Sequence, residues 1–205
     1  MKTLRLVLIT LLMGGVFSSR ADATSFLITV VTTPLMGLSG FLAFDFIAGS
    51  PVPGNSAVIS GFSTDSTLGG FSASGDHSGT LVPGPLTLGD TQFFNEWLQD
   101  IVSFSTTLSY RLDLGDATVS PGIPDSFSFF LLDTNQVPFT TSDPSGADAL
   151  FTIDLTGPST TPLVFASSFA VARVEPAPSA IPEPSTMGLL LTVLPLLLWK
   201  KGAMA

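Results

Sequence analysis

The residues best suited to catalysis are one histidine and its two neighbours. His77, the single histidine of the chain, lies between Asp76 and Ser78, and these three residue types form the catalytic triad of many hydrolases. Adjacent residues of an extended chain point to opposite faces, so the three side chains cannot line up as nucleophile, base and orienting acid. The sequence also lacks a recognisable nucleophile turn. We therefore expect a polar loop at His77 and no catalytic residue there.

Paired carboxylates are the other candidates for chemistry. Glycoside hydrolysis needs two, set about 5–10 Å apart, and the candidates here are Glu96, Asp100, Asp113 and Asp116. Glu96 and Asp100 are four residues apart, so they would share one face of a helix. That face is the polar one, where solvated carboxylates are ordinary. We therefore expect no catalytic pair and no enzymatic activity.

The sequence contains only weak patterns for a metal site and none for a cofactor site. The chain has no cysteine and a single histidine, which excludes thiolate chemistry and a typical zinc site. Residues 113–116 and 133–135 carry oxygen ligands of the kind that calcium prefers, but no Asp-x-Asp-x-Asp-Gly loop is present. A structural calcium ion remains an alternative, and no ligands are assigned to it. No cofactor is expected, because no glycine-rich phosphate loop occurs.

Composition narrows the class of protein. The chain has 205 residues, a net charge of −9, 45% hydrophobic and 11% charged residues. Fourteen of the sixteen acidic residues lie between Thr24 and Ala180, where Arg111 and Arg173 are the only basic ones. Nucleic-acid binders need clustered Lys and Arg to meet phosphates, so no nucleic-acid partner is expected. The length predicts one domain with appendages.

The pattern over residues 24–173 predicts an all-β fold. Several segments alternate apolar and polar residues, which is typical of strands with one buried face. Turn-forming Gly, Pro, Asn and Asp residues separate them. About seven to nine short strands at this spacing predict an antiparallel β-sandwich or jelly-roll-like domain. The predicted strands are 26–33, 40–47, 57–62, 103–114, 127–131, 149–155 and 165–172.

Residues 90–101 break this alternation. Their apolar positions are 93, 94, 97, 98 and 101, which is helical spacing. We therefore predict one short helix that covers an open end of the sandwich with its aromatic residues in the core. Trp97 and Tyr110, the single Trp and Tyr of the domain, both fit the core pattern. This weighs against a polysaccharide-binding module, which would stack sugars on exposed rings, but that function stays the alternative.

The N-terminal residues 1–23 have the pattern of a secretory signal. A basic start precedes an uncharged apolar run at 6–17, and Ala21 and Ala23 form a small-x-small cleavage site. The run is shorter than the roughly 20 residues that span a bilayer. We expect a signal helix that signal peptidase removes, with Thr24 as the first mature residue. An uncleaved anchor is the alternative.

The C-terminal segment has three parts after a Pro-rich linker at 174–181. The motif Pro182-Glu183-Pro184 comes first, an apolar stretch at 187–199 follows, and Lys200 and Lys201 come next. The apolar stretch predicts a short transmembrane helix of roughly 20 Å against a hydrocarbon core of about 30 Å. The two lysines lie where the positive-inside rule places them when the tail stays cytoplasmic. A plain membrane anchor is the alternative.

This three-part arrangement resembles the PEP-CTERM sorting signal. The resemblance implies a bacterial substrate of exosortase, a transpeptidase-like membrane protease, with cleavage at or near Pro182-Glu183-Pro184 and sorting to the cell surface or extracellular matrix. In the middle of the chain, Phe93–Glu96, Phe129–Leu132 and Asp143–Ala147 resemble exported PEP-CTERM proteins of one uncharacterised β-sandwich type. That second resemblance implies no activity.

Together these patterns predict an exported protein without enzymatic activity. It would be anchored transiently in the inner membrane through residues 187–199 and then secreted to the cell surface or matrix. Its expected partners are signal peptidase and exosortase, the membrane before processing, and an exopolysaccharide if the alternative function holds.

Overall fold

The described part of the chain is built from short strands. A computed structural model describes residues 24–49, 54–115, 123–155 and 160–178. The elements in chain order are β1 Thr24–Val31, the 3-10 helix η1 Thr33–Leu35, β2 Gly40–Ile47, β3 Ser56–Thr64, β4 Thr67–Ser74, β5 His77–Gly79, β6 Leu86–Gly89, β7 Phe94–Ser103, β8 Thr107–Gly115, β9 Ser126–Leu132, β10 Phe151–Asp154, β11 Leu163–Val164 and β12 Val171–Pro176.

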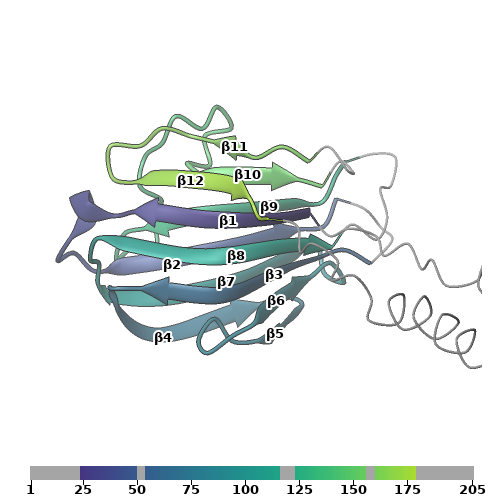
Figure 1. Cartoon of the computed structure of the whole chain (residues 1–205), viewed down its shortest axis with the longest axis horizontal. Coiled ribbons are helices and arrows are strands. Elements are labelled where there is room, and N and C mark those ends of the chain that lie inside the picture. The colour runs from purple at the N-terminus through teal and green to yellow at the C-terminus, as the bar shows by residue number, and fades with distance from the viewer. Residues whose placement is uncertain (1–23, 50–53, 116–122, 156–159, 179–205) are drawn as a thin grey trace, which may run out of the picture.

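These strands form two six-stranded antiparallel sheets. Sheet A has the order β12-β1-β8-β3-β6-β5, and sheet B has the order β11-β10-β9-β2-β7-β4. The sheets lie one behind the other in Figure 1, with β5 and β4 at one edge and β12 and β11 at the other. The predicted antiparallel β-sandwich is confirmed.

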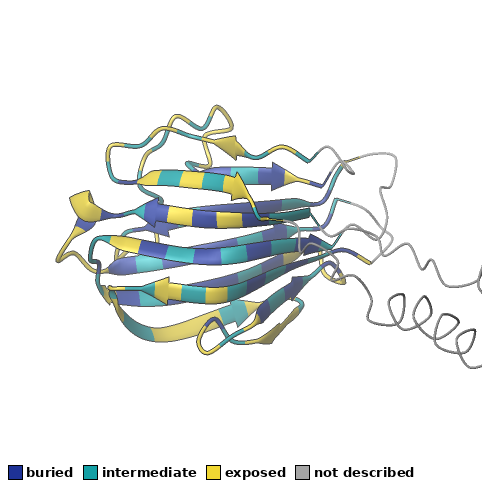
Figure 2. Cartoon of the chain, viewed as in Figure 1, coloured by how far each residue is buried: buried dark blue, intermediate teal, exposed yellow. Residues whose placement is uncertain are grey.

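Alternation along the strands places the core between the sheets. On β8, Leu108, Tyr110, Leu112 and Leu114 are buried while the residues between them are only partly covered. Figure 2 shows the same alternation along β1. Because the side-chain period of a strand is two, each sheet buries one face against the other.

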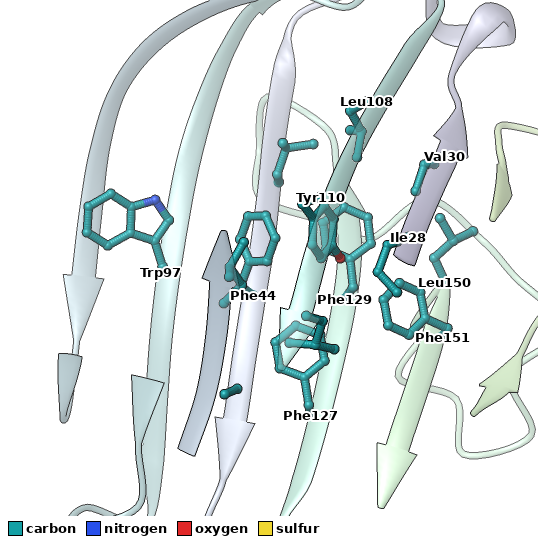
Figure 3. Packing of buried hydrophobic residues seen from close by; sticks show 14 of the residues in the cluster. Ile28, Val30, Phe44, Trp97, Leu108, Tyr110, Phe127, Phe129, Leu150 and Phe151 are labelled. Atoms are coloured by element: carbon teal, nitrogen blue, oxygen red, sulfur yellow. The ribbon is translucent and has the colours of Figure 1, made fainter. Parts of the chain in front are cut away.

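Aromatic rings fill the centre of this core. Phe44 from sheet B meets Tyr110 from sheet A edge-on at 5.5 Å between ring centroids, and Phe129 packs beside both. Figure 3 shows these rings together with Phe127, while Trp97 lies to one side of them. The predicted core positions of Trp97 and Tyr110 are confirmed, since these residues are 1% and 2% exposed.

The helix predicted over residues 90–101 is wrong, because this segment contains most of β7. That strand is hydrogen-bonded to β2 on one side and β4 on the other. Trp97 and Ile101 face the core, but Leu98 points the opposite way into a small outer cluster with Ala43 and Leu132. A strand with apolar residues on both faces produces spacings that imitate a helix.

The predicted aromatic stripe of this segment is wrong at its start. Phe93 is 74% exposed and Phe94 is 41% exposed, so neither belongs to the core. Phe94 follows the outward phase of β7, opposite Ile47 of β2.

The C-terminal boundary of the domain also differs from the prediction. β12 continues through Val174, Glu175 and Pro176, which pair with Ile28, Leu27 and Phe26 of β1. The first residues of the predicted linker are therefore part of sheet A.

The last strand, β12, begins later than the strand predicted at 165–172. Val171 is 57% exposed, whereas Ala172 and Val174 pack against the core. An irregular segment that ends at the buried Ala170 separates β11 from β12.

Candidate functional site

Strand β7 carries two unusual environments, one on each of its faces. Glu96 points outward from sheet B, and the neighbouring Trp97 points inward. Successive residues of a strand face opposite sides, so the two environments are separate candidates.

On the outer face, Glu96 forms a carboxylate pair with Asp45. The two residues are register partners on β7 and β2. Oδ1 of Asp45 is buried without a hydrogen-bond partner among the described residues. Burial and the negative charge of Glu96 raise the pKa of Asp45 to about 7, and burial also raises the pKa of Glu96. The pair therefore retains a proton near neutral pH.

One oxygen of this pair is closed to a substrate. A general acid must meet the glycosidic oxygen within hydrogen-bonding distance. Oδ1 of Asp45 has almost no solvent-accessible surface, so this oxygen does not meet a substrate on the outer face. The raised pKa of Asp45 makes the folding stability of the domain depend on pH.

The structure does not bring the predicted carboxylates together. Glu96 and Asp100 share the outer face of β7, but four residues of a strand span about 13 Å. Asp113 instead forms an ion pair with Arg111, whose Nε lies 2.8 Å from Oδ1, and it accepts a hydrogen bond from Ser25. Burial opposes ionisation of Asp113, but these two partners outweigh it and lower the pKa. Asp116 lies outside the described residues.

The second loop considered for calcium uses its carboxylate in its own turn. Asp133 accepts hydrogen bonds from the backbone N–H groups of Val137 and Asn135, and these lower the pKa of Asp133. In the parts of the chain that the structure describes, no group of three or more His, Cys, Asp or Glu residues is placed to hold a metal ion.

The trio around His77 does not form a triad. Nδ1 of His77 lies 3.1 Å from the carbonyl oxygen of Gly75, at the start of the short strand β5. The carboxylate of Asp76 accepts hydrogen bonds from the backbone and hydroxyl of Thr91 instead. The exposed imidazole is turned toward the ring of Trp97, at 6.3 Å between centroids.

On the inner face, Trp97 carries a stacked aromatic partner that sequence reasoning missed. Phe71 of β4 lies parallel to the indole, with 4.0 Å between centroids and 17° between planes. Trp97 is buried, whereas Phe71 is 57% exposed. The indole N–H has no partner among the described residues, so ring contacts hold Trp97 in place.

A β-bulge in β4 positions Phe71 over Trp97. Leu68 pairs with Ile101 and Phe71 with Gln99, so β4 has one more residue than β7 across this interval. The side-chain amide of Gln99 donates to the carbonyl oxygens of Gly69 and Gly70 at 3.1 and 2.9 Å. The signal in the sequence was Gly69-Gly70-Phe71, a pair of flexible residues before a large ring.

The features predicted at the two chain ends lie outside the described residues. They are the signal-peptide site at Ala21 and Ala23, the motif Pro182, Glu183 and Pro184, the apolar stretch at 187–199, and Lys200 and Lys201. Within the described ranges, no helix is long and apolar enough to cross a bilayer.

Comparison with models of known protein families, with curated proteins and with solved structures finds no match to this chain.

Proposed function

We propose that the chain is an exported bacterial protein of the cell surface or extracellular matrix, with a jelly-roll-like sandwich and no enzymatic activity. Signal peptidase removes residues 1–23, and exosortase cuts at or near Pro182-Glu183-Pro184. The observation that carries the proposal is the order of that motif, the apolar stretch at 187–199 and the basic residues Lys200 and Lys201.

The placement of the strand ends supports this route. β1 begins at Thr24, which pairs with Leu114 from its first position. At the other terminus, Pro176 of β12 pairs with Phe26 of β1. Both processing segments therefore join the domain at the same end of two neighbouring strands.

The charge of the domain suits release into an aqueous matrix. Arg111 and Arg173 are its only basic residues against an excess of acids, and it contains no lysine. A high net negative charge favours solubility and attracts cations to the surface. The burial of Oδ1 of Asp45 beside Glu96 supports the proposal that the domain has no hydrolase activity.

Cell fractionation tests the proposed route. The full chain is expressed in a host with and without its exosortase, and both termini of the released protein are identified by mass spectrometry. Deletion of Pro182-Glu183-Pro184 should keep the protein in the membrane fraction, while deletion of residues 179–181 should allow release. Equal release of the two deletion variants would contradict the proposal.

A second candidate function is polysaccharide binding. The observation that favours it is the exposed ring of Phe71, held flat on Trp97. This function is compatible with the first, because a matrix protein can be exported and then bind a polymer.

A further inference from the structure

We infer that Phe71 is a stacking platform for a pyranose ring of a non-acidic polysaccharide, at the edge of the sandwich between β4 and β5. The inference rests on the polysaccharide-binding candidate above and gives it a site and a ligand class. Trp97 supports the platform, and His77 supplies a polar contact beside it.

The stack fixes the orientation of the exposed ring. One face of Phe71 lies on the indole of Trp97 at 4.0 Å, which leaves the other face toward solvent. Phe93 is more exposed, at 74%, but has no ring partner among the described residues. A ring held in one plane loses little conformational freedom when a ligand stacks on it, which favours binding.

The bulge places Phe71 on the inner face of sheet B. Without the extra residue, the pairing of Leu68 with Ile101 would continue to Phe71 opposite Leu98, on the outer face of sheet B. With the bulge, Phe71 pairs with Gln99 and shares the inner face with Trp97. Bulges of this kind commonly re-aim a side chain beside a functional site.

A buried amide stabilises this irregular backbone. Gln99 is 5% exposed and its Nε2 donates to the carbonyl oxygens of both bulge glycines, Gly69 and Gly70. Burying a polar side chain is costly unless its hydrogen bonds are satisfied. Gln99, Gly69 and Gly70 therefore hold the bulge that places Phe71 on Trp97 with one face exposed.

His77 provides the directional contact that a sugar requires. It pairs with Leu88 of β6, so its side chain lies on the inner side of β5, as Phe71 does on β4. Because Nδ1 is used by the Gly75 carbonyl oxygen, Nε2 is the ring nitrogen that remains for a hydrogen bond with a hydroxyl group.

The chemistry of the platform selects the ligand class. The face of an aromatic ring carries partial negative charge, and the C–H groups on the flat side of an equatorially linked pyranose are partially positive. Asp76 immediately precedes His77 in the turn between β4 and β5, and its carboxylate accepts hydrogen bonds from Thr91. This carboxylate opposes an acidic sugar and favours a neutral or amino sugar.

Calorimetric titration of the full chain in detergent tests the inference. The probes are cellohexaose, a chitosan hexamer and an oligogalacturonate. We expect the first two to bind, and the acidic probe to bind at least about tenfold more weakly. Phe71→Ala should weaken binding of cellohexaose on the order of tenfold, which corresponds to the loss of one aromatic contact. Phe71→Tyr should retain binding, and Phe93→Ala is the matched control that should bind as wild type does.

Three results would overturn the inference: no binding of the neutral and amino-sugar probes, equal affinity of wild type and Phe71→Ala, or an equal loss in Phe93→Ala. Circular dichroism verifies folding, and Phe71→Leu replaces the alanine variant if that variant unfolds. Release into the medium is measured on the same variants. Sugar binding that depends on Phe71 together with failed release contradicts only the export route, and normal release without binding contradicts only this inference.

Discussion

Asp45 of β2 lies directly opposite Glu96 of β7, so two carboxylates are cross-strand neighbours on the outer face of sheet B. Like charges in this position destabilise a sheet. Burial and Glu96 together raise the pKa of Asp45 to about 7. The folded domain therefore retains a proton that the unfolded chain, with an ordinary Asp pKa of 3.8, has already lost.

The first prediction concerns stability against pH. A raised folded-state pKa gives a contribution that is complete below the unfolded pKa of 3.8 and is lost as pH rises through about 7. Urea denaturation at constant ionic strength should therefore give a free energy of unfolding that is higher at pH 5 than at pH 8 by up to about 2–3 kcal/mol. Asp45→Asn should reduce this difference and make the domain more stable than wild type at pH 8. An unchanged difference in the variant would show that Asp45 is not its source.

The fold was readable from the sequence wherever one face of a strand is apolar and the other polar. The strand predicted at 103–114 contains most of β8, because Ser109, Arg111 and Asp113 separate the side chains that are buried. β7 was not predicted as a strand, because Leu98 is buried on the outer face of sheet B while Trp97 is buried on the inner face.

The candidate sites depend on information that no local pattern contains. The pairing of Asp45 with Glu96 follows from the register between β2 and β7, which are far apart in the chain. The stacking of Phe71 on Trp97 depends on one extra residue in β4. Alternation identifies the faces of a strand, but it does not fix which residues of another strand lie opposite.

The second prediction compares two glycines in strands. A Cβ at Gly40 would lie 2.2 Å from the backbone oxygen of Leu132, whereas a Cβ at Gly70 would meet nothing within 4 Å. Gly40→Ala should lower the free energy of unfolding by about 1–3 kcal/mol, because β2 and β9 must separate to admit the methyl group. Gly70→Ala should be neutral or gain up to about 1 kcal/mol. Equal melting temperatures for the two variants would contradict the close approach of Gly40 to Leu132.

The third prediction concerns the cover over Trp97. The ring of Phe71 lies on the indole, so Phe71→Ala should expose Trp97 to water and shift its fluorescence emission to longer wavelength. Trp199→Phe provides the background in which Trp97 is the only tryptophan. The loss of stability should be modest, about 0.5–1.5 kcal/mol, because the lost contact lies at an edge. Emission that stays at the wild-type wavelength would mean that the stack does not shield the indole.

The fourth prediction concerns Asn95, a buried residue that joins three segments. Its Nδ2 donates to the carbonyl oxygens of Phe46 and Gln92 at 3.0 and 2.8 Å, and its Oδ1 accepts the backbone N–H of Asp76 at 2.6 Å. Asn95 therefore ties the start of β7 to the end of β2 and to the turn between β4 and β5.

Replacing this side chain leaves buried backbone groups without partners. Asn95→Ala should lower the free energy of unfolding by about 2–4 kcal/mol. Asn95→Asp has nearly the same shape and retains an acceptor for the N–H of Asp76, but it places a second oxygen against the two carbonyls that Nδ2 serves. We expect it to destabilise the domain too, and more at pH 7 than at pH 4, because a protonated carboxyl can still donate one hydrogen bond. Asn135→Ala, at an exposed turn, is the control and should change stability by less than about 0.5 kcal/mol. If Asn95→Asp were as stable as wild type at pH 7, the two donated hydrogen bonds would contribute nothing, and the join between β2 and β7 would depend on the strand pairing alone.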